Sequence, residues 1–191
     1  APQGERLAYV SRERDAHGNM SASVLKWAEI AAADIRIETL VEEGNAAIIS
    51  LAWHPDGHKI ALSRPRTEEG PPFIEQVDLA GNRSLLHTFV DPEAVDPELH
   101  TWAFISLNWS PAGKHLAYHL RKNSASLTAD VVETRVLNIE TGQELELSPG
   151  LSYPQWLAYS PAGEQLASIA GGGRDLVSNK RLEVVDLVTG Q

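Results

Sequence analysis

Short apolar segments alternate with polar turns along the whole chain, and one such pattern recurs. Residues 50–62 consist of an apolar segment with a tryptophan, a Pro-x-Gly turn and a second apolar segment, and residues 106–118 and 156–168 repeat this order. Residues 1–9 carry the same pattern without its first segment. The prolines lie at positions 2, 55, 111 and 161, so the periods are 53, 56 and 50 residues. Recurrence at this spacing indicates a repeat architecture.

A second turn follows each proline at a nearly constant distance. It ends an apolar segment whose aliphatic residue lies 24, 28 or 26 residues after the proline, at Leu79, Ile139 and Leu187. The turn glycines are Gly81, Gly142 and Gly190. In the first copy the counterpart is residues 29–34, where the turn glycine is missing.

These two turns predict four antiparallel strands in each repeat. Proline presets φ near −65° and glycine takes φ > 0, which suits a tight turn between strands. The second strands are predicted at 59–63, 115–120 and 165–169, the third at 73–79, 133–139 and 181–187, and the fourth at 83–89 and 143–147. Four strands in about 45–50 residues is typical of a β-propeller blade. We therefore predict an all-β chain, one β-propeller segment of four repeats: 1–46, 47–101, 102–152 and 153–191.

Two segments also fit a helix. Residues 25–33 are rich in alanine and leucine, which favours a helix locally. The repeat places this segment at the third strand of its blade, and we give repeat context more weight than local propensity. Residues 93–99 could form a helical turn inside a loop.

Composition and charge narrow the class of protein. The 191 residues are 42% hydrophobic and 22% charged, which is the profile of a soluble globular chain. Acidic residues outnumber basic ones by 26 to 16, giving a formal net charge of −10, which argues against nucleic-acid binding. No apolar run is long enough to span a bilayer, and the first residues do not form a signal peptide. The absence of cysteine excludes disulfides and thiolate chemistry.

The Trp-Ser-Pro-Ala-Gly-x-x-Leu-Ala-Tyr pattern of residues 109–118, with its downstream Thr-Gly turn, resembles the repeat of TolB-type and WD-like β-propellers. Similar repeats occur in the propeller domains of prolyl-oligopeptidase-like peptidases. The resemblance covers essentially the whole chain. Three residues depart from it, since Ala112 and Ala162 replace the usual aspartate and Tyr159 replaces the tryptophan, whereas Asp56 keeps the turn carboxylate. The resemblance implies a periplasmic or extracytoplasmic scaffold that binds a protein or peptide.

The recurring aromatic residues are predicted to be core residues and not ligand contacts. Trp53, Trp109 and Tyr159 occupy one repeat position beside a tight turn, where a large side chain can fill the space between neighbouring blades. Leu51, Leu107 and Leu157 lie two residues earlier, on the same strand face. Alanines at 61, 117 and 167 indicate close approach of neighbouring strands or blades.

Strand order predicts where a binding surface lies. The turns between strands one and two and between three and four are tight and share one side of the sheets. The other connections, 11–23, 64–72, 90–101, 121–130 and 170–180, are long and emerge on the opposite side, called here the long-loop side. Binding residues favour loops on a rigid scaffold. The candidate binding residues are Arg12, Arg14, Asp15, His17, Arg64, Arg66, Glu98, His100, Arg121, Lys122, Arg174 and Asp175. The same charges could instead form a solvated rim.

No catalytic or cofactor motif is present in the sequence. It has no Gly-x-Ser-x-Gly elbow, no His-Glu-x-x-His pair and no phosphate-binding loop, and the acidic stretch 91–98 lacks calcium-loop spacing. We therefore predict no catalytic residues, no cofactor and no metal. The expected function is a non-catalytic protein-binding scaffold. The alternative is the propeller portion of a prolyl-oligopeptidase-like peptidase whose hydrolase domain lies outside this chain.

The position of the repeats along the chain leads to a further expectation. The first repeat lacks strand one and the last lacks strand four, so fourteen strands are expected (4 × 4 − 2). The ring is then incomplete, and we expect either missing blades or edge-to-edge self-association at the strands near Leu7 and Tyr9 and at residues 182–187.

Overall fold

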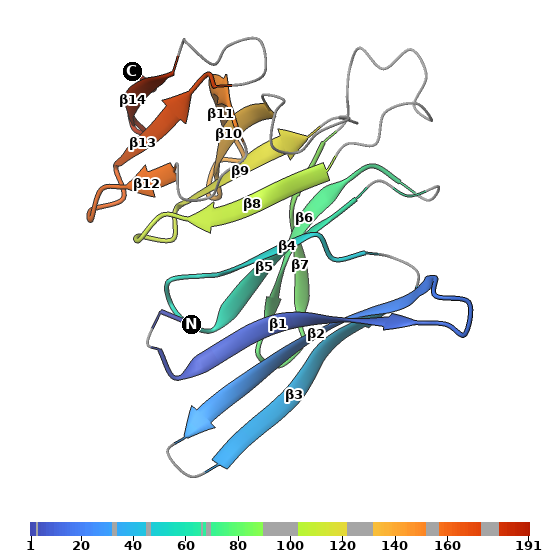
Figure 1. The fold of residues 1–191 in the computed structure, drawn as a ribbon. Coiled ribbons are helices and arrows are strands. Elements are labelled where there is room, and N and C mark those ends of the chain that lie inside the picture. The colour runs from blue at the N-terminus through green and yellow to red at the C-terminus, as the bar shows by residue number, and fades with distance from the viewer. Residues whose placement is uncertain are drawn as a thin grey trace. The chain divides into compact units, whose positions relative to one another are not determined.

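A computed structural model describes residues 1–2, 4–31, 34–44, 47–65, 67, 70–89, 103–121, 132–151, 157–172 and 180–191. The elements in these residues are all β-strands, β1 to β14, and every sheet contains only antiparallel neighbours (Figure 1). The chain divides into two compact units, Ala1–Val90 (unit 1) and Asp91–Gln191 (unit 2). Each unit contains two sheets.

Unit 1 contains the first and second sheets. The first sheet has the order β1-β2-β3, with β1 at Arg6–Arg14, β2 at Met20–Ala31 and β3 at Asp34–Glu43. The second sheet has the order β4-β5-β6-β7. Its strands are β4 at Ser50–Trp53, β5 at Lys59–Arg64, β6 at Phe73–Asp78 and β7 at Arg83–Thr88.

Unit 2 contains the third and fourth sheets. The third sheet is an up-and-down meander of β8 at Ala103–Trp109, β9 at His115–Arg121, β10 at Val132–Asn138 and β11 at Glu144–Gly150. The fourth sheet consists of β12 at Leu157–Tyr159, β13 at Gln165–Ala170 and β14 at Arg181–Asp186. The predicted all-β class is confirmed, and the predicted strands agree with the described ones to within one residue at each end, except that β11 continues three residues beyond the predicted 143–147. Residues 25–31, which could have been helical, lie in β2.

The Pro-x-Gly turns form because their glycines take the left-handed conformation. Gly57, Gly113 and Gly163 have φ of 72°, 71° and 77°. Each glycine donates its backbone N–H to the carbonyl three residues earlier, at 2.8–2.9 Å. Gly4, with φ 77°, makes the same bond to Ala1 at 3.0 Å, so the truncated first copy keeps the turn. The turns after the third strands are closed by similar backbone hydrogen bonds.

Each unit has its own apolar core between its two sheets. In unit 1, Leu25 and Val41 of the first sheet pack with Ile60, Leu62 and Val77 of the second, and Trp53 lies against this cluster. In unit 2, Ala117, Val136 and Leu147 of the third sheet pack with Leu157 and Leu166 of the fourth, and Tyr159 lies against them. Trp109 is also buried. The prediction that the recurring aromatic residues belong to the core is confirmed.

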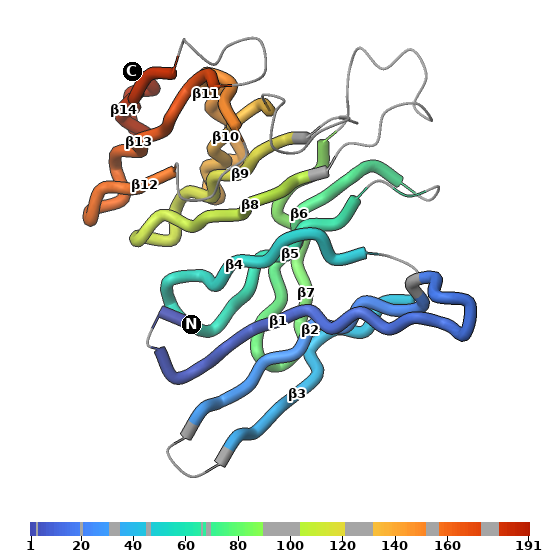
Figure 2. Tube along the Cα trace, viewed as in Figure 1, coloured from blue at the N-terminus to red at the C-terminus, as the bar shows by residue number. Residues whose placement is uncertain are grey.

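One predicted loop is wrong. Residues 11–23 do not form a long connection, because β1 continues to Arg14 and β2 begins at Met20. The two strands form one long hairpin, which Figure 2 shows as a blue tube that is darker along β1 and lighter along β2. The predicted loop 64–72 is also shorter than expected, since Arg64 belongs to β5 and Thr67 and Gly70 exchange backbone hydrogen bonds. Residues 90–101, including the predicted helical turn at 93–99, lie outside the described residues.

Candidate functional site

The tip of the β1–β2 hairpin carries four of the predicted binding residues. Asp15 shapes the turn, because its Oδ1 accepts the backbone N–H of His17 at 2.8 Å and of Asn19 at 2.9 Å. The hydrogen bond from the Asn19 backbone is the main cause that lowers the pKa of Asp15. Arg14 donates from Nη1 to the Gly18 carbonyl at 2.6 Å. Arg12 and His17 are exposed on the same hairpin. The structure thus brings Arg12, Arg14, Asp15 and His17 together on a hydrogen-bonded tip.

The sequence holds a signal for this hairpin that was missed. The turn Asp15-Ala16-His17-Gly18-Asn19 has the same Asp-x-x-Gly-Asn pattern as residues 78–82, which were predicted to form a tight turn. Asp78 accepts from Ala80 and Asn82 as Asp15 accepts from His17 and Asn19. The first turn lies between strands two and three of its repeat, whereas residues 78–82 lie between strands three and four.

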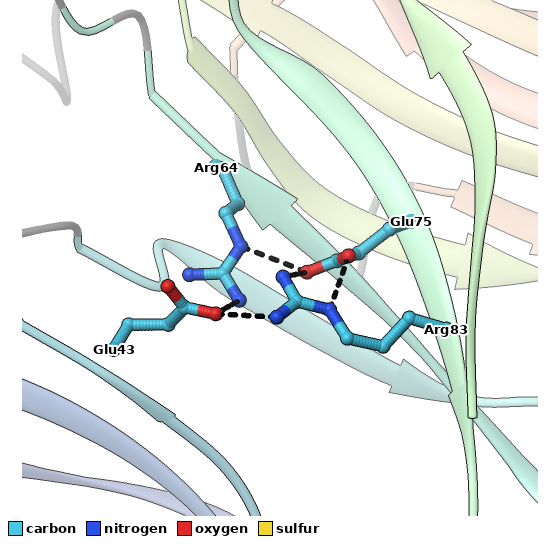
Figure 3. A network of polar contacts seen from close by, with 4 residues as sticks. All are labelled: Glu43, Arg64, Glu75 and Arg83. Atoms are coloured by element: carbon cyan, nitrogen blue, oxygen red, sulfur yellow. Dashed lines mark hydrogen bonds and ion pairs between the residues drawn. The ribbon is translucent and has the colours of Figure 1, made fainter. Parts of the chain in front are cut away.

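Arg64, predicted to be a loop residue on the binding surface, is instead buried between the two sheets of unit 1. Its side chain is 4% exposed and lies between Glu75 of β6 and Glu43 of β3 (Figure 3). Arg64 Nε donates to Glu75 at 2.8 Å and Nη2 donates to Glu43 at 3.0 Å. The prediction overlooked this position because it placed the end of β5 one residue too early.

Arg83 completes a network of four charged residues with Arg64, Glu43 and Glu75. From β7 it donates Nη2 and Nε to the two oxygens of Glu75, at 2.8 and 2.9 Å, and Nη1 to Glu43 at 2.7 Å. The hydrogen bond to Glu75 is the main cause that raises the pKa of Arg83. Two positive and two negative groups alternate, so the network has no net formal charge. We interpret it as a clamp that joins β3 of the first sheet to the second sheet.

For the other predicted binding residues the structure describes at most the backbone. Arg121 ends β9, but nothing is described of its side chain. The remaining ones lie outside the described residues: Arg66, Glu98, His100, Lys122, Arg174 and Asp175. Their place in a binding surface stays a prediction.

Two cavities lie beside the tight turns, where the sequence analysis placed no function. In unit 2 a cavity of about 440 Å³ is lined by His115, the start of β11 at Glu144 and Leu145, and the turn residues Val188 and Gly190. In unit 1 a cavity of about 210 Å³ lies among the first residues of the chain and Asp56 and His58. No sequence motif marks either one, because the cavities arise where two sheets meet.

The described residues contain no group of three or more histidine, aspartate or glutamate side chains that could hold a metal ion. Within the same part of the chain, no helix is long and apolar enough to cross a membrane.

Comparisons with known proteins bear on the fold. No family model matches the sequence. No curated protein sequence matches it either. Solved structures do match, at low sequence identity.

An oligogalacturonate lyase in complex with manganese matches with a TM-score of 0.62 and 13% identity, over 98% of this chain and 49% of that one. The β-propeller domain of the Trilobed protease from Pyrococcus furiosus matches with a TM-score of 0.53 and 16% identity, over 95% and 50%. A protein described as TolB from Agrobacterium tumefaciens matches with a TM-score of 0.51 and 19% identity, over 97% and 60%.

This chain therefore spans about half the length of the structures it matches. Identities below 20% establish the fold and not the activity. The four antiparallel sheets, the recurring turns and these matches agree, and the chain has the fold of a TolB-like β-propeller.

Proposed function

We propose that this chain is a non-catalytic scaffold that binds a protein or peptide on its long-loop side. The observation that carries the proposal is the β1–β2 hairpin, which holds exposed charged side chains on a hydrogen-bonded turn. A tip whose backbone is fixed before binding loses little conformational entropy when a partner docks. The scaffold reading of the repeat and the TolB-like fold support the same function.

The first strand of the hairpin, β1, has nine residues, whereas its counterparts β5, β9 and β13 have six, seven and six. By the repeat alignment Leu7 of β1 corresponds to Ile60 of β5, so Ser11 corresponds to Arg64, where β5 ends. β1 continues through three further residues to Arg14. Three residues of extended strand measure about 10 Å. Arg12, Arg14 and His17 therefore lie on an extension that the repeat itself does not require.

The test compares the two sides of the protein by site-specific photo-crosslinking. A crosslinking amino acid is placed at Arg12 or His17 on the hairpin, and at Thr141 or Asn82 on the tight turns, and each variant is exposed to an extract of the source cells. We expect a specific adduct from the hairpin positions alone. With the crosslinker at His17, the double change Arg12→Glu and Arg14→Glu should abolish the adduct, while Arg36→Glu, which changes an exposed arginine on β3, should leave it unchanged. Adducts from the tight-turn positions alone would contradict the proposal.

A second candidate function is the propeller portion of a prolyl-oligopeptidase-like peptidase. The match to the propeller domain of the Trilobed protease favours it. The discriminating measurement is peptide hydrolysis by the whole natural protein that contains residues 1–191. Cleavage that is lost when a serine hydrolase inhibitor is added would support this candidate over the scaffold.

The scaffold is proposed to act in the periplasm or another extracytoplasmic compartment, as the TolB-like repeat implies. Cell fractionation tests this part separately. Recovery of the natural protein only with cytoplasmic markers would refute the compartment and leave the binding proposal to the crosslinking result.

A further inference from the structure

One inward-facing position of the sheets holds a tryptophan in unit 1 and a valine in unit 2. Trp27 of β2 lies opposite Ala8 of β1, and Val136 of β10 lies opposite Ala117 of β9. The two alanines occupy the same position of the repeat, so Val136 stands where the first sheet has Trp27. Both alanines pack in the apolar core of their unit. Because directly opposite residues of antiparallel strands point to the same face, Trp27 and Val136 both face the neighbouring sheet of their unit.

In unit 1 this place is filled by the side chains of Trp27 and Arg6. Trp27 is 7% exposed, and the guanidinium carbon of Arg6 lies 5.3 Å from the centre of its indole ring. Arg6 Nη1 also donates to the carbonyl of Gly57, in the tight turn between β4 and β5, at 3.4 Å. The two side chains therefore occupy the space between the first sheet and the second.

In unit 2 the same place is open. His115 directly precedes the leucine of its repeat, as Arg6 does in the first copy, so an imidazole replaces the guanidinium and a valine replaces the indole. The cavity of about 440 Å³ is lined by His115, Val136 and Leu145 of the third sheet and by the turn residues 187–190 of the fourth. The cavity therefore lies in the place that Arg6 and Trp27 fill in unit 1.

The open space follows from residues inside the third sheet. In unit 1 the turn that corresponds to residues 187–190 contains Gly81, and the strand β7 follows it. Trp27 and Arg6 fill the place between the sheets of unit 1 with β7 present. The cavity of unit 2 is thus set by the smaller residues Val136 and His115.

The lining of the cavity suits an uncharged ring. Val136 is buried and Leu145 packs against the same core, so this part of the lining is apolar. Burial lowers the pKa of His115 below its ordinary value of 6.5, so the imidazole is neutral at pH 7. The charged lining residues Lys114 and Glu140 are exposed and opposite in sign. A neutral, mostly apolar ligand therefore fits this cavity better than an ion does.

We propose that the cavity of unit 2 binds a small aromatic molecule, whose ring takes the place that the Trp27 indole fills in unit 1. An apolar cavity of about 150 Å³ is enough to hold benzene, and small-molecule sites commonly measure about 300–1,000 Å³. The 440 Å³ cavity is therefore large enough for a fused ring such as indole. Apolar contacts with Val136 and Leu145 supply most of the affinity. This site goes beyond the proposed scaffold function and shares no residue with the hairpin tip, so either proposal can fail alone.

The probe is indole, and its binding to the whole chain is measured by isothermal titration calorimetry. We expect saturable binding, and Val136→Trp, which places an indole in the cavity, should weaken it at least tenfold. Leu85→Trp, which adds a tryptophan at an exposed position of β7, is the control and should leave the affinity unchanged. Val136→Leu fills part of the cavity and should weaken binding at least threefold, which covers the case in which the tryptophan variant fails to fold.

The reciprocal change tests the comparison between the two units. Trp27→Val should open a matching cavity in unit 1, so this variant should bind indole at a second site and be stabilised by indole more than the parent is. A folded Trp27→Val variant that gains no site would contradict the correspondence between the two places.

Nuclear magnetic resonance then locates the ring, since bound indole should shift the methyl signals of Val136 and Leu145. The absence of saturable binding, or equal affinity of the parent and Val136→Trp, would overturn the proposal. The peptide Gly-Trp-Gly serves as a second probe. Its binding at least tenfold more tightly than indole would also overturn the proposal, because the occupant would then be a tryptophan side chain of a partner protein and not a free molecule.

Discussion

The two units join their sheets by different chemistry at corresponding positions. In unit 1, Arg64 and Glu75 are almost fully buried and form ion pairs with each other and with Glu43 and Arg83. In unit 2, the position of Arg64 is taken by Leu120 in the third sheet and by Ala170 in the fourth, and both are buried. The sheets there are joined by an apolar core and by Ser148, which donates to Glu183. One fold thus tolerates either a neutralised charge network or a hydrocarbon contact in the same place.

Buried titratable groups follow the same distinction. Arg64 and Glu75, which are buried in unit 1, each have partners of opposite formal charge. Unit 2 buries His119, whose Nδ1 lies 3.1 Å from Thr134 Oγ1. Burial lowers the pKa of His119 to about 4, so this side chain is neutral at pH 7. Among the described residues, the buried arginine and glutamate of unit 1 thus form ion pairs, whereas the buried His119 of unit 2 has no carboxylate hydrogen-bond partner and is neutral.

The largest expected effect comes from breaking the charge network of unit 1. Glu75→Ala removes the acceptor of Arg64 Nε and leaves Arg64 buried with Glu43 as its remaining carboxylate partner. We expect the free energy of unfolding to fall by about 3–5 kcal/mol. Glu183→Ala, at the corresponding position of the fourth sheet, is the matched control and should cost about 1 kcal/mol or less, because its partner Arg181 is 62% exposed. Urea unfolding of both variants measures the difference.

A double change separates charge from packing in this prediction. Arg64→Leu with Glu75→Leu removes both buried charges and leaves Glu43 paired with Arg83 at 2.7 Å. We expect this variant to be more stable than Glu75→Ala, since no buried charge is left without a partner. A double variant as unstable as the single one would show that the network contributes through its shape and not through charge neutralisation.

The next effect is the pH dependence that His119 gives to unit 2. The folded-state pKa of about 4 is below the ordinary value of 6.5, so the unfolded chain binds the proton first as pH falls. Stability contributed by neutral His119 is therefore complete above pH 6.5 and is lost between pH 6.5 and 4. The loss is on the order of 3 kcal/mol, at 1.36 kcal/mol for each pKa unit. Unfolding curves of the parent and His119→Gln across this range should differ by that amount. Parallel pH profiles would contradict the assignment.

Much of this architecture follows from local signals, and the exceptions have identifiable causes. Positions of Pro-x-Gly and Thr-Gly turns predicted the strands correctly because turn chemistry is read from adjacent residues. Burial of Arg64 could not be predicted in this way, since it depends on Glu43, 21 residues away, and on Arg83 in another strand. The hairpin tip was misread because its Asp-x-x-Gly-Asn turn lies where the other repeats have long connections. The cavity beside β14 depends on the packing of two sheets and has no local signature.

Close backbone packing in unit 2 gives a smaller effect. Gly150 ends β11, and a Cβ added there would lie against the carbonyl oxygen of Ile169, closer than non-bonded atoms approach. Gly150→Ala should therefore lower the free energy of unfolding by about 1–3 kcal/mol, because the backbone at residue 150 or at Ile169 must shift. Gly44, which follows β3 in unit 1, is the matched control, since an added Cβ meets nothing within 4 Å. Gly44→Ala should leave the unfolding midpoint unchanged or raise it slightly. Equal losses in both variants would show that sheet contacts at Gly150 are no closer than at Gly44.

The smallest expected effect concerns a serine that occupies the same repeat position in both units. Ser106 of β8 has φ 57°, in the left-handed region, where the pairing of β8 with β9 shifts register between Ile105 and Asn108. Ser50 of β4 is its counterpart and pairs regularly with Ser63. A non-glycine residue in that region costs about 1 kcal/mol, which glycine avoids, whereas the backbone entropy that glycine loses on folding lowers the stability of both variants by a similar amount. The Ser106→Gly variant should therefore have a free energy of unfolding about 1 kcal/mol higher than that of the Ser50→Gly variant, as measured by thermal unfolding. Equal melting temperatures would show that the left-handed backbone at Ser106 carries no strain that glycine can relieve.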